Sequence, residues 1–358
     1  MNLSSKTLSA FLGASLRFSS LSLVAAVLSS TLNAAELTGA GASLPAPVYV
    51  SWSDAYFKAT GNRINYQSIG SGGGVKEVIG KSIDFGATDI PLSAADLEKH
   101  GLVQFPTVVG GVVLIANLPG VQPGEVKLSG PVLADIFMGK IAHWRHPDIA
   151  RLNSGVKLPD MAIAVVRRSD GAGSTLTLSN YLSKVSPAWK QKLGEGTVVQ
   201  WPRGLGGKGD EGVDGFVQRL PGSIGYVDFA YAHQHKLATI QMQNSSGEFV
   251  AANEQSIGAA AAAADWEKYA FGPYLTDLSA KGVWPLASTT FILMRKLQDK
   301  PAIGTEALKY FDWAYKRGAK SVADNGYVPV PDGTVSLILG AAWPQLKDPA
   351  GKPVFAQQ

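Results

Sequence analysis

The chain of 358 residues contains no cysteine. Without cysteine the fold has no disulfide, no thiolate metal site and no redox-active thiol pair, and no lipid anchor can be attached through a cysteine. Charged residues are also few, at 17% of the chain, whereas hydrophobic residues make up 46%. This balance is typical of a globular protein and not of a disordered one. Burial of a hydrophobic core must therefore stabilise the fold.

Acidic residues are missing from the start of the chain. Residues 1–35 contain no Asp or Glu, carry Lys6 and Arg17, and include an apolar segment at 21–28 that small residues up to Ala35 follow. This order of basic, apolar and small residues is typical of a secretory signal peptide. The apolar segment is too short for a membrane-spanning helix, which needs about 20 residues. We therefore expect a signal peptide, cleaved near Ala35, and a mature protein outside the cytoplasmic membrane.

A strong excess of charge of either sign is absent as well. The formal net charge of +4 becomes +2 without Lys6 and Arg17, as 30 basic minus 28 acidic residues, and no basic run stands out. Nucleic acid is therefore not an expected partner. The mature chain of about 320 residues exceeds the length at which one hydrophobic core usually stops growing, so two lobes are expected.

Short β-rich runs alternate with segments of helical periodicity along the mature chain. Strands are expected at residues 37–42, 64–69, 83–87, 108–116 and 162–166. Helices are expected after the first, the second and the last of these strands, and at residues 305–317, where Gly318 is placed as a left-handed stop. The alternation predicts an α/β fold with largely parallel strands.

Three of these strands run into glycine-rich turns with a hydroxyl side chain at the start of a helix. Ser43 follows the first strand, Ser71 the second, and Ser174 the last. A helix N-terminus offers free N–H groups and the positive end of the helix dipole to an anion. Each loop alone is more commonly an ordinary capped helix start. Because ligands of open α/β sheets bind at the carboxyl ends of the strands, the combination predicts one oxyanion cage.

Two charged side chains adjoin these loops. Arg168 can present two parallel N–H donors to an oxyanion, with Asp170 holding the guanidinium in place, although a solvated loop arginine is the simpler alternative. Asp89 follows the strand at 83–87, a place where a capping or turn aspartate is common. A carboxylate repels a bound anion unless the anion carries a proton that the carboxylate accepts. Asp89 is therefore expected to select phosphate, which carries such a proton near neutral pH, over sulfate, which does not.

Eight blocks of sequence carry a family resemblance. They are TGAGASLPAPVY at 38–49, NYQSIGSGGGVK at 65–76, DFGATD at 84–89, FPTVVGGVV at 105–113, AVVRRSDGAGS at 164–174, WPRGLGGKG at 201–209, VQRLPGSIGYV at 217–227 and STTFIL at 288–293. Through them the mature chain resembles, over nearly its whole length, the periplasmic phosphate-binding proteins of high-affinity phosphate ABC transporters.

The resemblance implies an α/β fold of the two-lobed periplasmic-binding-protein type (type II), a clamp with a double crossover and the ligand in the interlobe cleft. Lobe one would comprise residues 36–108 and 286–358, and lobe two residues 109–285. The implied function is to bind inorganic phosphate in the periplasm and deliver it to the integral-membrane permease subunits of an importer with a cytoplasmic ATPase. A monomer without catalytic activity, metal or cofactor is expected.

The resemblance also implies which groups hold the phosphate. They would be the Ser43 hydroxyl, the Leu44 N–H, Ser71, Asp89, Arg168, the N–H groups of Ala172 and Gly173, and Ser174, with Asp170 orienting Arg168. Ser43 and Leu44 stand where the family commonly has Thr and Phe, and Ala172 stands where it usually has Ser. A hydrogen bond to a charged group is worth about 1.5 to 3 kcal/mol. The missing hydroxyl at 172 should weaken binding by about one to two decades unless Thr175 or a water replaces it.

Two other classes of function stay open at this stage. A secreted phosphatase would need a metal cluster or an activated nucleophile, and the close pairs His143/His146 and His233/His235 have no obvious carboxylates around them. A binding protein for another oxyanion is the second alternative. Asp89 argues against sulfate and molybdate, whereas protonated arsenate should compete with phosphate.

Overall fold

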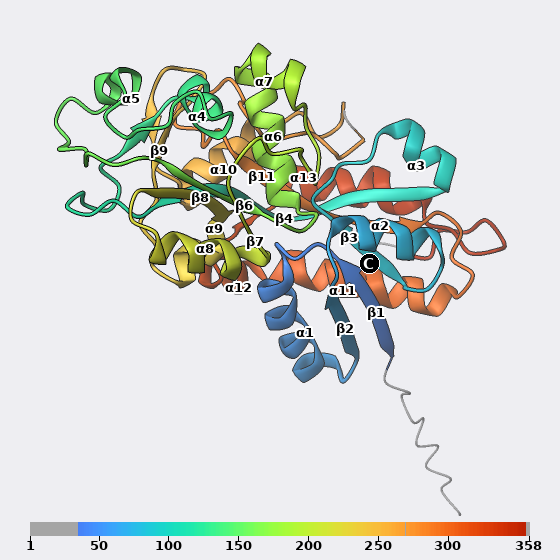
Figure 1. Cartoon of the computed structure of the whole chain (residues 1–358). Coiled ribbons are helices and arrows are strands. Elements are labelled where there is room, and N and C mark those ends of the chain that lie inside the picture. Colours follow the sequence, from blue (N-terminus) through green and yellow to red (C-terminus); the bar gives the residue numbers. More distant parts are fainter. Residues whose placement is uncertain (1–34, 269, 356–358) are drawn as a thin grey trace, which may run out of the picture. The chain divides into compact units, whose positions relative to one another are not determined.

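The computed structural model describes residues 35–268 and 270–355 (Figure 1). The predicted signal peptide lies outside the described residues, except for Ala35. Within the described part, no helix is long and apolar enough to cross a membrane.

The described chain forms a nine-stranded mixed sheet and a small three-stranded one. The strands of the large sheet are β1 (Glu36–Gly41), β2 (Arg63–Ser68), β3 (Phe85–Thr88), β4 (Leu102–Ala116), β6 (Ala164–Arg168), β7 (Leu205–Gly207), β8 (Ser223–Asp228), β11 (Ala287–Arg295) and β12 (Val328–Pro329). Their order is β2-β1-β3-β11-β4-β8-β6-β7, and β12 pairs with β4. The small sheet consists of β5 (Lys127–Leu128), β9 (Gln241–Gln243) and β10 (Phe249–Val250).

Helices follow most of the strands. They are α1 (Ala46–Thr60), α2 (Ser71–Ile79), α3 (Ala94–His100), α4 (Gly130–Phe137), α5 (Pro147–Leu152), α6 (Gly173–Val185), α7 (Pro187–Lys192), α8 (Gly209–Arg219), α9 (Phe229–Gln234), α10 (Glu254–Ala263), α11 (Pro301–Arg317), α12 (Ala319–Asp324) and α13 (Asp332–Leu337). The predicted strands correspond to β1, β2, β3, β4 and β6, and the predicted helices to α1, α2, α6 and α11, with shifted ends.

The strand directions differ from the prediction at the centre of the sheet. β1 is parallel to β2 and β3, and β6 is parallel to β7 and β8, as the alternating pattern predicts. However, β11 is antiparallel to β3 and β4, and β4 is antiparallel to β8. Figure 1 shows the reason, because β4 and β11 run between the β1–β3 group and the β6–β8 group. Long strands that carry the chain across and back must run in opposite directions.

Buried apolar side chains of the described chain form two large clusters and a smaller one. β4 contributes to both large clusters, with Val103, Phe105 and Val108 in one and its buried apolar residues from Val109 onwards in the other. β11 does the same, since Ala287 belongs to one cluster and Ile292 to the other. Its pairing with β4 shifts register between Thr290 and Phe291, close to this change of core. The molecule therefore has two lobes that share a pair of strands.

The predicted left-handed stop at Gly318 is wrong. Gly318 has φ −83°, and α12 begins at the next residue. A Cβ atom at this position would lie 2.4 Å from Trp52 Nε1, and the Trp52 indole N–H donates to the Gly318 carbonyl oxygen at 3.2 Å. Glycine is required here for the close approach of α1, and not for the backbone angle.

Candidate functional site

Four loops at the carboxyl ends of parallel strands carry the residues predicted from the sequence. β1 leads to Ser43 and Leu44, β2 to Ser71, β3 to Asp89, and β6 to Arg168, Asp170, Ala172, Gly173 and Ser174. A cleft of ≈ 450 Å³ is lined in part by Ser43, Leu44, Arg168 and Asp170. In the described chain the other predicted residues are not part of this lining. One of them, Ser174, contacts a lining residue directly, because its Oγ accepts from Arg168 Nη1 at 3.1 Å.

Asp89 is a buried carboxyl group at the end of β3, 6% exposed. Thr290 of β11 donates to its Oδ1 at 2.5 Å. The hydroxyl of Ser71 donates to Oδ2 at 3.3 Å and accepts the backbone N–H of Asp89 at 3.0 Å. Burial raises the pKa of Asp89 from 3.8 to about 6, although the bonds from Thr290 and Ser71 and the charge of Arg168 lower it. Near neutral pH its carboxylate is therefore mostly ionised but poorly solvated.

Gly173, the first residue of α6, packs directly against Asp89. A Cβ atom at position 173 would lie 2.4 Å from Asp89 Oδ2, closer than any real Cβ contact. A Cβ atom at Gly70 would lie 3.7 Å from the carbonyl oxygen of Gly171, so the loops of the two lobes meet here. The N-terminus of α6, which is the positive end of its dipole, therefore lies beside the Asp89 carboxylate.

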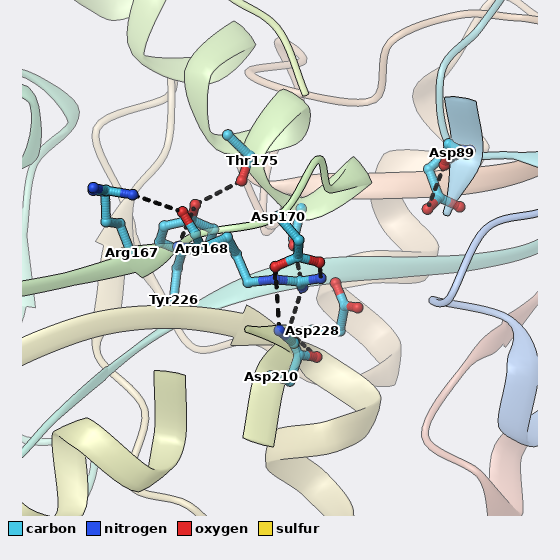
Figure 2. Close-up of polar contacts among 11 residues, drawn as sticks. Asp89, Arg167, Arg168, Asp170, Thr175, Asp210, Tyr226 and Asp228 are labelled. Carbon is cyan, nitrogen blue, oxygen red and sulfur yellow. Dashed lines mark hydrogen bonds and ion pairs between the residues drawn. The ribbon is translucent and has the colours of Figure 1, made fainter. Parts of the chain in front are cut away.

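Arg168 is surrounded by carboxyl groups (Figure 2). Asp170 accepts from Nε at 2.9 Å and from Nη2 at 2.6 Å, while Asp210 accepts from Nη1 at 2.9 Å. With the bond to Ser174, four of the five guanidinium N–H groups are hydrogen-bonded to described residues, and one hydrogen of Nη2 remains. The expected pair of parallel donors for a ligand is thus not free, because carboxylates occupy those directions.

The electrostatics of this cluster keep Arg168 charged. Burial lowers its pKa, but the hydrogen bonds with Asp170 and the charges of Asp210 and Asp228 raise it by more. The net result is a raised pKa. In return, the hydrogen bond from Arg168 lowers the pKa of Asp170 from 3.8 to about 2. The Arg168–Asp170 pair is therefore ionised across the whole neutral range.

Asp210 and Asp228 line the same cleft and are not predicted from the sequence. Asp210 lies in the first turn of α8, Asp228 ends β8, and the backbone N–H of Asp228 donates to Asp210 Oδ2 at 3.1 Å. A signal existed for Asp228, because it ends a buried strand just as Asp89 does. The sequence offers no such signal for Asp210, which is 42 residues away from the Arg168 it contacts.

Ala172 and Thr175 were expected to offer the ligand an N–H group and a replacement hydroxyl, and both groups have other partners in the structure. The backbone N–H of Ala172 donates to the carbonyl oxygen of Thr197 at 3.0 Å, so in this structure it is not available to a ligand. Ala172 is the N-cap residue of α6 and provides no side-chain cap. Thr175 Oγ1 lies 2.6 Å from the hydroxyl of Tyr226, so it is directed into the lobe and does not replace the missing hydroxyl.

Ser43 and Leu44 lie in the loop before α1, and neither is the N-cap residue of that helix. The N-cap residue of α1 is Pro45, and the exposed Ser43 accepts the N–H of Ala46 with its carbonyl oxygen at 3.1 Å. The Leu44 carbonyl oxygen accepts a hydrogen bond from the hydroxyl of Tyr327, which also lines the cleft. Ser43 therefore lines the cleft, and its side chain does not cap α1.

Comparisons with known proteins agree with this architecture. Residues 26–317 match the PBP superfamily domain. The phosphate-binding protein PstS of Pasteurella multocida is 48% identical over 91% of this chain and 95% of its own, and that of Haemophilus influenzae is 48% identical over 87% and 93%. A solved phosphate-binding protein from Stenotrophomonas maltophilia, 20% identical over 85% of this chain and 93% of its own, has the same fold with a TM-score of 0.64. The predicted two-lobed α/β fold is confirmed, and the chain belongs to the PstS family of phosphate-binding proteins within the PBP superfamily.

Proposed function

We propose that the protein binds inorganic phosphate between its two lobes in the periplasm and delivers it to the membrane permease of an ABC importer. The identification of the ligand rests on one observation, which is that the buried Asp89 carboxylate packs against the first turn of α6. An anion drawn to this helix N-terminus is repelled by Asp89 unless it brings a proton. Phosphate brings one near neutral pH and sulfate does not. The names of the relatives that are 48% identical support the same ligand.

In this proposal the donors come from three elements. The N–H of Gly173 and the hydroxyl of Ser174 lie at the positive end of α6, and Arg168 contributes its remaining Nη2 hydrogen. The Ser43 hydroxyl and the Leu44 N–H add donors from the loop before α1. Together they stabilise the oxyanion mainly through hydrogen bonds and the helix dipole, because most of the charge of Arg168 is balanced by neighbouring carboxylates.

Asp89 is the acceptor of the phosphate proton. Ser71 and Thr290 fix its carboxylate by donating to Oδ2 and Oδ1. Since Thr290 belongs to β11 and Ser71 to α2, the position of the acceptor depends on the packing of both elements. Asp170 and Asp210 fix Arg168 in the same way.

We also propose the lobe boundaries and the partners. Residues 36–108 with 286–358 would form one lobe and residues 109–285 the other, a division supported by the change of hydrophobic core along β4 and β11. The bend would then lie in these two strands, close to the register shift of β11. Residues 1–35 would be removed on export, and the loaded clamp would dock on permease subunits that a cytoplasmic ATPase drives.

Titration calorimetry of the mature protein with phosphate, arsenate and sulfate tests the ligand. We expect phosphate and arsenate to bind and compete, and sulfate to give no heat of binding. Equal affinity for sulfate would refute the role of Asp89. Turnover of a chromogenic phosphomonoester that Asp89→Asn abolishes would instead favour an enzyme. Phosphate uptake by cells that lack the protein, with and without complementation, tests the delivery step.

A further inference from the structure

The cleft contains more carboxyl groups than its one buried guanidinium can balance. Asp170 and Asp210 both form ion pairs with Arg168, at 2.6 and 2.9 Å. Asp228 lines the same cleft, and its backbone N–H donates to Asp210 Oδ2 at 3.1 Å. Full ionisation would therefore place three negative charges around a single positive one. Figure 2 shows Asp170, Asp210 and Asp228 gathered on the Arg168 side, with Asp89 apart from them.

Asp228 is the member of this group that lacks a partner. It is 8% exposed, and its Oδ1 has no hydrogen-bond partner among the described residues. An ionised carboxylate that is buried without a partner costs several kcal/mol, so the group is neutralised or meets a ligand. The backbone bond from Asp228 to Asp210 Oδ2 holds Asp228 next to Asp210, whose Oδ1 is already paired with Arg168, so two neighbouring buried residues with carboxyl groups depend on one guanidinium.

The surroundings of Asp228 favour that proton. The titratable groups that act on it or share its cleft are Asp210 and Glu211 of α8, Arg168 of β6, Asp170 and Asp89 at strand ends, Lys208, Tyr231 and Tyr327. Burial raises the pKa of Asp228 well above its usual value of 3.8, the charges of Asp210 and Asp89 raise it further, and Arg168 lowers it. Burial likewise raises the pKa of Asp210, against the effect of Arg168.

We propose that Asp210 and Asp228 share one proton in the cleft, and that the phosphate-binding form of the protein is the one that holds this proton. This inference rests on the proposed function. Loss of the proton to solvent leaves both carboxyl groups ionised and adds one negative charge beside the anion. Asp228 is therefore a positioning and specificity residue. It keeps the field around Arg168 from becoming too negative for phosphate, in addition to the selection of a protonated anion by Asp89.

The pH dependence of affinity distinguishes this role from a structural one. Affinity should fall as the pH rises through the upper ionisation of the pair, because both residues line the cleft and one added charge there weakens anion binding by about 10- to 100-fold. Asp228→Asn keeps the shape but cannot lose a proton. Its affinity should therefore fall much less between about pH 6 and about pH 10 than that of the parent. The ionisation of phosphate itself affects both proteins equally and cancels in their ratio.

The chain offers a second variant and a matched control. Asp210→Asn also removes the coupling between the two carboxyl groups, so it should flatten the profile even if Asp228→Asn does not fold. Asp214 of α8 is a buried carboxyl, 5% exposed, that pairs with Gln218 and Tyr231 and does not belong to the lining of this cleft. Asp214→Asn should therefore show the profile of the parent.

Calorimetry in buffers of different ionisation enthalpy gives an independent readout. At alkaline pH, phosphate binding should draw a proton onto the pair, so the parent and Asp214→Asn should take up more protons than Asp228→Asn or Asp210→Asn. Parallel affinity profiles and equal proton uptake in all four proteins would overturn the inference and leave phosphate binding intact. A parent protein that binds no phosphate would overturn the proposed function and this inference with it.

Discussion

Replacement of Asp89 by asparagine separates what this carboxylate costs the fold from what it contributes to binding. The pKa of Asp89 rises from 3.8 to about 6 because the group is buried. A difference of about 2 units corresponds to about 3 kcal/mol. In the ligand-free protein this is the free energy by which the ionised carboxylate destabilises the folded state above pH 6.

The sign follows from the raised pKa. The stability that comes from the neutral carboxyl is fully present below pH 3.8, and it is lost as the pH rises to about 6. Asn stays neutral throughout, so the free energy of unfolding of Asp89→Asn minus that of the parent should increase by about 3 kcal/mol between about pH 4 and about pH 7. Altered hydrogen bonds to Thr290 and Ser71 add only an offset that does not depend on pH.

Urea unfolding without phosphate, at several pH values, measures this difference. Binding should change in the opposite direction, because the charged acceptor of the phosphate proton is lost, at about 1.5 to 3 kcal/mol or 10- to 100-fold in affinity. Sulfate binding should appear in Asp89→Asn, since the repulsion is removed. A stability difference that is constant with pH would refute the burial argument, and unchanged phosphate and sulfate affinities would refute the selection argument.

Three further changes test the rest of the site. Ala172→Ser supplies a side-chain N-cap to α6, which should add about 1 kcal/mol to the stability. Calorimetry should also show tighter phosphate binding. No tightening would mean that a serine hydroxyl at position 172 does not reach the ligand. Gly173→Ala places a Cβ 2.4 Å from Asp89 Oδ2, which costs about 1 to 3 kcal/mol in overpacking. If this cost falls on the bound state, phosphate affinity should drop by about 10- to 100-fold, while the circular dichroism spectrum stays that of the parent. Undiminished affinity would contradict the close contact. Asp170→Asn should weaken phosphate binding. Because the pKa of Asp170 is lowered to about 2 in the folded state, the variant should also lack the stability that the parent loses as the pH falls from 3.8 to about 2. An acid-unfolding curve with the same shape as the parent's would argue against the ion pair with Arg168.

The limits of sequence-based prediction are visible in β4. Its predicted start at residue 108 is six residues later than the observed start at Leu102. Pro106 interrupts the strand pattern, because proline cannot donate to a sheet. The strand continues through it with a bulge, in which Thr290 and Phe291 of β11 pair with Val108 and Pro106 and leave Thr107 as the extra residue. The pairing partner that holds this bulge is a strand about 180 residues further along the chain, which no local pattern contains.

The site divides in the same way. Asp170 lies two residues after Arg168, and the helix starts at Ser71 and Gly173 follow directly from strand–glycine–helix patterns, so the chemistry for an oxyanion was readable locally. The pairing of Arg168 with Asp210, and the use of the Ala172 N–H by Thr197, depend on segments that approach only in the folded lobe.

The sequence by itself predicted the class of ligand and the loops that we propose to bind it, because helix starts, glycines and an isolated strand-end carboxylate are local features with fixed chemistry. Only the tertiary structure decided how many donors of Arg168 remain free, which carboxyl groups surround it, and that Asp89 faces Gly173 across the lobes. The physical reason is that the burial and the charge balance of a side chain depend on all the groups that surround it in space. Residues distant in the chain fill that space, so its electrostatics exist only once the two lobes have packed.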